Sequence, residues 1–247
     1  MSDIQYSDHI RHYQKDAEFQ NYFENNPFED HNIKRRYAYI FKWLSPIDNK
    51  TILEVGSGGG HAIEHIKREK CAYVPLDIPL INLQGIKSKG PKKIYPVSGD
   101  AYKLPFKDNC FNAVIISEVL EHLQNPAFVL EEISRVILND GLILVSVPYK
   151  EKISYQICVH CNQPTPTHAH FHSFDENSIL EFTRKTDLKM DCKRKLNNKF
   201  LSRISIFLKI NYLPFHLWLI LDRLMNIIFP KPTHILFQFR KSSVLFK

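Results

Sequence analysis

Short apolar runs alternate with amphipathic stretches from residue 51 onward. The apolar and alternating runs predict strands over 51–55, 71–78, 92–100, 111–117, 141–148, 188–196 and 234–241. The amphipathic stretches between them predict helices over 61–70, 81–86, 126–137 and 175–184. Because strand–helix–strand repetition at this spacing requires crossover connections, the pattern predicts an α/β fold with a largely parallel sheet.

Three segments do not follow this alternation. Residues 1–49 interleave aromatic and charged positions and predict a helical N-terminal extension, which would cap a domain over 50–247. That domain is interrupted by insertions at 149–174 and 199–232. Within the second insertion, 20 of the 30 residues over 200–229 are apolar, but polar residues and a proline break the run too often for a membrane span. We expect an interfacial element, a cover over an acceptor pocket, or a helical cap packed on the domain.

The charge is distributed unevenly. The chain has 247 residues and a net charge of +7, yet residues 183–247 contain 14 Lys and Arg against 3 Asp and Glu. A basic end of this kind suits a membrane surface, a nucleic acid or an anionic substrate, and it equally suits a solubilising face. The chain opens on polar residues, and its five cysteines are scattered except for Cys158 and Cys161. These features favour a cytoplasmic protein, with peripheral membrane contact as a further expectation.

A glycine-rich turn follows the first predicted strand, in the sequence ILEVGSGGGHAIEHI. A turn of this kind between a strand and a helix lets a ligand approach the backbone at the carboxyl end of the sheet. The dinucleotide pattern G-x-G-x-x-G fails because its third position is His61. The turn fits E-x-G-x-G-x-G instead, through Glu54, Gly56, Gly58 and Gly60.

That motif resembles motif I of the class I S-adenosylmethionine-dependent methyltransferases, and the chain is similar to their type 11 group. Three further segments agree in order: Asp77 after the second strand, Gly99-Asp100-Ala101 with a following Leu-Pro-Phe, and FNAVIISEVLEHLQNP, where Asn112 replaces the usual Asp. The resemblance implies a Rossmann-like, seven-stranded mixed sheet with helices on both faces. It also implies that the last strand, 234–241, lies antiparallel between the fifth and sixth strands.

The resemblance implies S-adenosylmethionine as the cofactor and methyl transfer as the chemistry. Glu54 would orient the amino group of the cofactor, Asp77 would accept hydrogen bonds from the ribose hydroxyls, and Asp100 would contact the adenine amino group. The alternative is that these acids cap helices or lie on the surface. The residues expected to complete the cofactor site are Gly56, Ser57, Gly58, Gly60, Ala101 and Ser117.

The run SEVLEH carries the candidate catalytic residues Glu118, Glu121 and His122. If a helix begins at Glu118, the three side chains share one face and suit a hard cation such as Mg²⁺. The run resembles two groups of metal-dependent O-methyltransferases, one acting on ubiquinone precursors and one on the terminal 2′-hydroxyl of small RNAs. Without a metal, the helix would simply line the pocket, with His122 as a general base.

A second cluster lies in the insertion after the fifth strand. Cys158 and Cys161 have the spacing of a zinc knuckle, and His168, His170 and His172 follow them. Two thiolates and two imidazoles would close a structural zinc site, and the insertion would form a lid over the acceptor. In an extended segment the three histidines would point to one face. A rival interpretation sends one histidine to the site of Glu118, Glu121 and His122, and a third leaves all five as ordinary loop residues.

These observations predict O-methylation of a small-molecule, saccharide or lipid-linked acceptor. The alternatives are a metal-dependent RNA 2′-O-methyltransferase and a non-catalytic cofactor-binding protein of the same fold. A nucleic-acid partner is disfavoured because the basic region is apolar rather than arginine-rich and polar.

Overall fold

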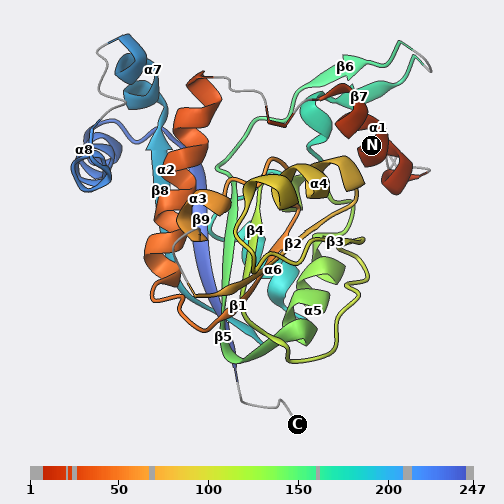
Figure 1. Ribbon diagram of the computed structural model, residues 1–247. Helices are drawn as coiled ribbons and strands as arrows, with labels where there is room; N and C mark the ends of the chain where they lie inside the picture. Colours follow the sequence, from red (N-terminus) through yellow and green to blue (C-terminus); the bar gives the residue numbers. More distant parts are fainter. Residues whose placement is uncertain are drawn as a thin grey trace.

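A computed structural model describes residues 8–20, 22–23, 27–66, 70–159, 162–207 and 213–242, and it centres on a seven-stranded sheet (Figure 1). The strand order is β3-β2-β1-β4-β5-β9-β8. The strands are β1 (Thr51–Val55), β2 (Ala72–Asp77), β3 (Val97–Ser98), β4 (Phe111–Ser117), β5 (Ile137–Pro148), β8 (Leu188–Asn198) and β9 (Pro232–Lys241).

The first five strands of this sheet are parallel and the last two pairings are antiparallel. Residue pairs such as Leu53 with Val114 align β1 with β4, whereas β9 runs opposite to both β5 and β8. The predicted mixed sheet and the antiparallel insertion of the last strand between the fifth and the next are therefore confirmed.

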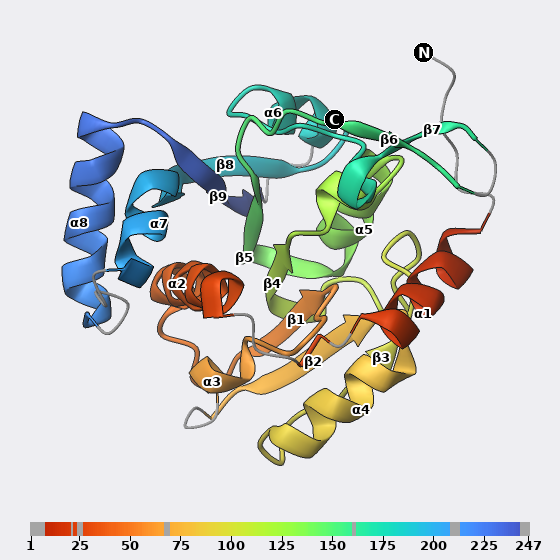
Figure 2. The ribbon, with the colours of Figure 1, turned by 90° about the horizontal axis from the view of Figure 1, so that it is seen from above.

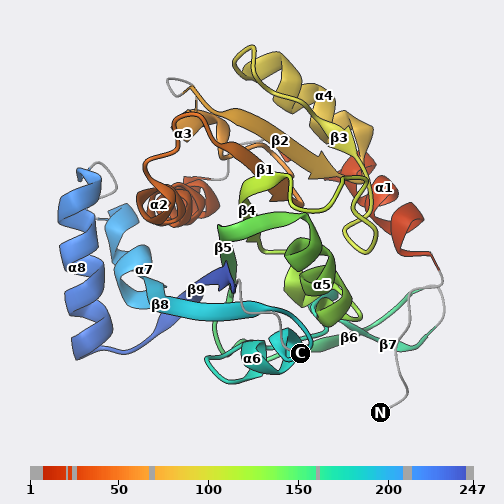
Figure 3. The ribbon, with the colours of Figure 1, turned by 90° about the horizontal axis from the view of Figure 1, so that it is seen from below.

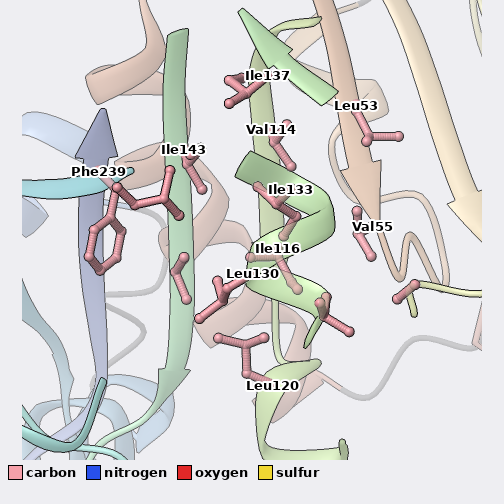
Figure 4. Packing of buried hydrophobic residues seen from close by; sticks show 14 of the residues in the cluster. Leu53, Val55, Val114, Ile116, Leu120, Leu130, Ile133, Ile137, Ile143 and Phe239 are labelled. Atoms are coloured by element: carbon pink, nitrogen blue, oxygen red, sulfur yellow. The ribbon is translucent and has the colours of Figure 1, made fainter. Parts of the chain in front are cut away.

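Helices cover both faces of the sheet (Figures 2 and 3). Alternate residues of β4 supply both cores, with Val114 and Ile116 on one side and Ala113 and Ile115 on the other. The first core lies under α5 (Pro126–Val136) and α6 (Ser178–Thr183), as Figure 4 shows for Ile116, Leu130 and Ile133. The second core lies under α2 (Pro27–Leu44), α3 (Ile63–Ile66) and α4 (Leu80–Lys89). A strand that is buried on both faces needs a continuous apolar run. Such runs are visible in the sequence, so they predict these strands.

Three predicted elements differ from the observed ones. The strand expected over 92–100 is reduced to β3, because Pro96 removes a backbone donor just before it. The helix expected over 61–70 appears as the single turn α3 within the described residues. The helix expected from Glu118 is a 3₁₀ turn, η1 (Leu120–His122), and Glu118 itself has a positive φ of 56°.

The two insertions form different structures at opposite sides of the molecule. The first contains the hairpin of β6 (Tyr155–Ile157) and β7 (Pro164–Pro166), followed by a short 3₁₀ segment, η2 (Thr167–Ala169). The second contains α7 (Lys199–Phe207) and α8 (Phe215–Ile228), which lie beside α2 and β8 (Figure 2). No helix among the described residues has both the length and the apolar character needed to cross a bilayer.

The N-terminal region divides between the core and the top of the sheet. Tyr37, Ile40 and Leu44 of α2 are buried against the sheet, so this helix is part of the domain core. The preceding helix, α1 (His9–Phe19), lies away from the core beside α4 and β3 (Figures 2 and 3).

Candidate active site

The glycine turn after β1 holds a backbone that other residues would not adopt. Gly56, Gly58 and Gly60 have φ values of +72°, +46° and +72°. A side chain on Gly56 would collide with Val119, and one on Gly59 would collide with the backbone oxygen of Tyr22. A side chain on Gly58 would meet only the Tyr22 ring, at 3.7 Å. The glycines are thus required partly by contacts within the protein, and at Gly58 there is open space beyond the backbone.

Two of the predicted acidic residues face a cavity. Asp77, at the end of β2, accepts hydrogen bonds from the Gly58 and Ile78 amides at 2.7 and 2.8 Å. Burial raises the pKa of the Asp77 carboxyl, while these amides oppose that rise. Asp100 accepts a bond from the Tyr102 amide and lies 2.9 Å from His9 Nε2. Both carboxylates therefore have fixed orientations at the carboxyl edge of the sheet.

Glu54 of β1 points into the domain core. Its carboxyl is fully buried and accepts hydrogen bonds from Tyr37 of α2 at 2.5 Å and from Tyr73 of β2. Burial raises the pKa of Glu54 to about 7, although the two tyrosine hydroxyls lower it. The cavity is bordered by Val55 and Gly56 rather than by Glu54. Both carboxyl oxygens of Glu54 bind tyrosines, and a role for Glu54 in orienting a cofactor amino group stays a prediction.

A cavity of about 620 Å³ opens at this edge of the sheet. Predicted cofactor residues Gly56, Gly58, Asp77, Asp100 and Ala101 line one side. The rest of the wall comes from α1, from the β6–β7 hairpin and from the turn after β4, including His9, Tyr13, Asp16, Glu118, His122, Gln156, Thr165 and His168. The first insertion therefore borders the cavity, as expected of a lid. The described part of the second insertion supplies none of the residues that line this cavity.

Two predicted serines are buried near this wall. Ser57 is 2% exposed and Ser117 is 6% exposed, and neither hydroxyl has a hydrogen-bond partner within the described structure. Gly60 lies against Ile63 and Ile86 of the second core. These three residues support the turn from inside the domain rather than line the cavity.

The turn after β4 points Glu118 towards an ion-pair network. Its Oε2 lies 3.1 Å from His234 Nε2 and 3.6 Å from Arg36 Nη1, while Oε1 is buried without a partner in the described residues. Burial alone would raise the pKa of Glu118, but Arg36 and His234 outweigh it and lower this pKa to about 2. Thr233 lies 2.8 Å from the other nitrogen of His234. Glu118 is thus a fixed, ionised carboxylate at the cavity wall.

Glu121, His122 and His170 form a cluster of potential metal ligands. Their ligand atoms all lie within 4.8 Å of one another. Glu121 is fully buried, and within the described structure neither of its carboxyl oxygens nor Nδ1 of His122 has a hydrogen-bond partner. Burial, with the Glu118 charge, raises the pKa of Glu121 well above its usual range. Buried donors and acceptors normally have partners, so this cluster fits a cation.

The insertion reaches this cluster through its backbone. The Phe171 amide donates a 2.7 Å hydrogen bond to the Glu121 carbonyl oxygen, which brings His170 to the turn. The His170 ring then lies 4.6 Å from the His122 ring, and its Nδ1 lies 2.5 Å from Glu151 Oε2. The rival interpretation, in which a downstream histidine joins Glu121 and His122, agrees with this placement. Glu118 does not share their face, because its positive φ turns it towards Arg36 and His234.

The predicted zinc residues do not gather in the part of the chain that is described. His168 borders the cavity with a positive φ of 60°, and His172 packs on Phe182 with ring centroids 5.3 Å apart. The segment is not extended: the His168 and His170 rings lie 6.0 Å apart, whereas His172 turns away to Phe182. Cys158 lies in the β6–β7 turn outside the cluster of candidate ligands, and Cys161 lies outside the described residues. A zinc site containing Cys161 stays a prediction.

Several site residues had no signal in the sequence. Arg36, Glu151 and His234 come from three distant segments and contact the candidate catalytic residues only after folding. The α1 residues His9 and Tyr13 reach Asp100 and the His122 carbonyl in the same way, the latter at 3.4 Å. A single histidine or arginine in an amphipathic segment does not predict which distant residue it will contact in the fold.

Comparison with known proteins agrees with this geometry. Residues 53–145 match the model of a methyltransferase domain, which covers the glycine turn, Asp77, Asp100 and the turn after β4. Over this range the chain is similar to class I S-adenosylmethionine-dependent methyltransferases. S-adenosylmethionine is accordingly the cofactor that this family implies for the cavity.

The proteins that are similar to this chain have names that refer to different activities. A probable S-adenosylmethionine-dependent methyltransferase of Mycobacterium tuberculosis is 26% identical over 46% of this chain and 42% of its own length. A ubiquinone biosynthesis O-methyltransferase of Hydrogenovibrio crunogenus is 21% identical over 64% of this chain and 70% of its own length. The solved structure of the [4+2]-cyclase SpnF has a TM-score of 0.61 at 15% identity, covering 85% of this chain and 80% of that one.

The similarity covers only part of several of these relatives. The chain spans about half the length, or less, of the M. tuberculosis relative and of others it matches. Similarity to a cyclase at 15% identity concerns the fold alone. The similarity to methyltransferases therefore supports the architecture and the implied cofactor.

Proposed function

We propose that the protein transfers a methyl group from S-adenosylmethionine to a hydroxyl of a small-molecule, saccharide or lipid-linked acceptor. The observation that carries this proposal is the position of Glu118 and His122 on the wall of the same cavity as the glycine turn, Asp77 and Asp100. A donor and an acceptor bound there would lie side by side, and alignment contributes most of the rate because the sulfonium is already a reactive donor.

The cofactor half of the proposal rests on the strand ends. Gly58 leaves room at the turn, and the Asp77 carboxylate accepts hydrogen bonds from the Gly58 and Ile78 amides and from the Asn82 side chain. Its remaining acceptor capacity suits ribose hydroxyls. Asp100, which already contacts His9 of α1, would receive the adenine amino group at the far end of the cavity.

The acceptor half rests on the cluster of Glu121, His122 and His170. One carboxylate and two imidazoles suit a divalent cation, with Mn²⁺ or Zn²⁺ favoured over Mg²⁺ by the nitrogen donors. A bound cation would gather an acceptor hydroxyl and ease its deprotonation. Glu151 holds the far nitrogen of His170, which orients that imidazole towards the cluster. Glu118, ionised and held by Arg36 and His234, is placed to accept a hydrogen bond from a second hydroxyl through Oε1.

A lipid-linked acceptor would require the protein to reach a membrane surface. The exposed apolar face of α8 offers a place for such a peripheral contact. The similarity to a ubiquinone biosynthesis O-methyltransferase supports a hydroxyl acceptor of this general kind.

The first test is calorimetric titration of the purified chain with S-adenosylhomocysteine, followed by methyl transfer from labelled S-adenosylmethionine to a panel of diols, saccharides and quinols. We expect micromolar binding, and its loss in Gly58→Arg. Ser88→Arg is the matched control, because it adds the same charge at an exposed position of α4. Equal binding by wild type and Gly58→Arg would contradict the cofactor site.

A second candidate function is 2′-O-methylation of RNA. The approach of His170 to Glu121 and His122 favours it, since a downstream histidine completes the metal site of the RNA group that this run resembles. Labelled methyl transfer to a short RNA with a free terminal ribose, and not to small diols, would establish this alternative.

A non-catalytic cofactor-binding protein is the alternative of another class. Micromolar binding of S-adenosylhomocysteine without methyl transfer to any diol, saccharide, quinol or RNA would favour it over both reactions.

A further inference from the structure

Helix α8 presents its apolar residues outward. Leu217, Ile220, Leu224, Ile227 and Ile228 are between 42% and 69% exposed. At 100° per residue these five positions fall within one arc of about 100° on the helix. Phe200 of α7 and Phe229 extend the same apolar surface, since their rings lie 5.8 Å apart and both are about half exposed. We call these seven residues the α8 face.

The opposite side of α8 is anchored to the domain by polar and aromatic contacts. Trp218 is fully buried, with His31 packed edge-on at 4.5 Å and the Arg35 guanidinium 4.7 Å from its ring. Asp222 is buried and accepts hydrogen bonds from the Asn197 and Asn198 amides and from Tyr39. The helix is thus fixed in orientation, and the exposure of its leucines and isoleucines is not a result of loose packing.

The exposed charges of the segment that contains the α8 face all have one sign. Over 199–232 the chain has five Lys and Arg and one acidic residue, Asp222, which is buried. Lys199, Arg203, Arg223 and Lys231 are exposed. Arg223 lies at the edge of the apolar arc, one turn before Ile227. An apolar arc with cations as the only exposed charges of its own segment is the pattern of a helix that lies in a lipid headgroup region.

The position of α8 in the molecule fits contact with a flat surface. In all three views the helix lies at the outer edge, on the side away from α1 and α4 (Figures 1, 2 and 3). A second copy of the chain is the less suitable occupant, because a two-fold contact would bring identical cations together without an exposed acid from the same segment to pair them. A large apolar patch on a soluble domain otherwise marks an interaction site.

We propose that the α8 face docks on an anionic lipid surface, with its leucine, isoleucine and phenylalanine side chains in the headgroup–acyl boundary and Lys199, Arg203, Arg223 and Lys231 against lipid phosphates. This contact is independent of methyl transfer, and its test needs no acceptor. It would hold the cavity, which lies at the other side of α2, at a fixed distance from the membrane.

The test is co-sedimentation of the full chain with vesicles of phosphatidylcholine alone or with about one third phosphatidylglycerol. We expect binding to the anionic vesicles and at least tenfold weaker binding to the neutral ones. Ile220→Glu/Ile227→Glu should weaken anionic-vesicle binding by at least tenfold. Leu80→Glu/Ile81→Glu is the matched control on α4, with side chains of similar exposure, and should bind like wild type. Arg223→Gln should weaken binding about fivefold and reduce its salt dependence.

Three results would overturn the proposal. They are absence of binding to anionic vesicles by wild type, equal binding by the α8 and α4 variants, and a dimer that Ile220→Glu/Ile227→Glu converts to monomer while vesicle binding is unchanged. Binding of S-adenosylhomocysteine by each variant serves as the check of folding. Its loss in wild type would count against the proposed function alone and leave the membrane contact intact.

Discussion

Two fully buried carboxyl groups, Glu54 and Glu121, lie at neighbouring strand ends and have opposite surroundings. Glu54 accepts hydrogen bonds from Tyr37 and Tyr73, whereas both oxygens of Glu121 lack a partner in the described structure. Burial raises both pKa values. A buried carboxyl with its partners in place stabilises the fold, while one without partners costs stability and is retained for a ligand. Glu54 thus supports the fold, whereas Glu121 is the carboxyl that we propose as a ligand of a cation.

The largest expected effect on the free energy of unfolding comes from substitution of Glu54, the carboxyl that has its hydrogen-bond partners. Glu54→Ala leaves a cavity and two buried tyrosine hydroxyls without an acceptor, so the free energy of unfolding should fall by about 3–5 kcal/mol. Urea denaturation followed by circular dichroism measures this. Glu181→Ala, on the exposed surface of α6, is the control and should change stability by less than about 0.5 kcal/mol. Similar losses of unfolding free energy in Glu54→Ala and Glu181→Ala would contradict a stabilising role for Glu54, and with it the contrast between Glu54 and Glu121.

The pH dependence of stability distinguishes a raised pKa from simple packing. The pKa of Glu54 in the folded protein is about 7 against 4.5 for the ordinary group, so its protonated form is favoured by folding. Its contribution to stability is complete below pH 4.5 and is lost as pH rises through 7, a change of about 3 kcal/mol. The difference in unfolding free energy between wild type and Glu54→Gln should therefore shrink by this amount between pH 4.5 and pH 8. A constant difference would contradict the shift.

Substitution of Glu121, which lacks hydrogen-bond partners in the described structure, should not destabilise the metal-free protein. Glu121→Gln should not lower the melting temperature of the metal-free protein, because it removes a carboxyl that has no hydrogen-bond partner there. Saturating Mn²⁺ should stabilise wild type by about 2–3 kcal/mol at a hundredfold excess over its dissociation constant and leave Glu121→Gln unchanged. Thermal melts with and without Mn²⁺ measure both effects, and equal stabilisation of the two proteins would exclude this cluster as the metal site.

The smallest effect tests whether the partners of Glu54 act separately. Tyr37→Phe removes one hydroxyl and leaves Glu54 its bond from Tyr73, so we expect a loss of about 1–2 kcal/mol. The double variant Tyr37→Phe/Tyr73→Phe should lose more than the sum of the single variants, since it converts Glu54 into an orphan like Glu121. Additive losses, from urea denaturation of all three, would show that the network is not cooperative.

Much of the architecture could be predicted from the sequence. Each central strand is buried on both faces and therefore requires a continuous apolar run. The strands 51–55 and 111–117 agree with the observed ones residue for residue. The orientation of α8 could not be predicted, since its apolar residues face outward and its anchors are Trp218 and Asp222. For the site, the local motifs placed Gly58, Asp77 and Asp100 at the cavity. The separation of Glu118 from Glu121 depends on a backbone turn and on Arg36 and His234, which no local pattern contains.

The place of β9 in the sheet has a consequence for the order in which a nascent chain can assemble. β9 lies between β5 and β8 and is hydrogen-bonded to both, yet it is synthesised after them and after both helices of the second insertion. Until it leaves the ribosome, β5 has a bare hydrogen-bonding edge and β8 has no neighbour in the sheet. Five parallel strands can form during translation, but the remaining two join together at a late step. Unpaired strand edges promote aggregation, so crowding of ribosomes on one message would be the condition in which this protein is most exposed to misassembly.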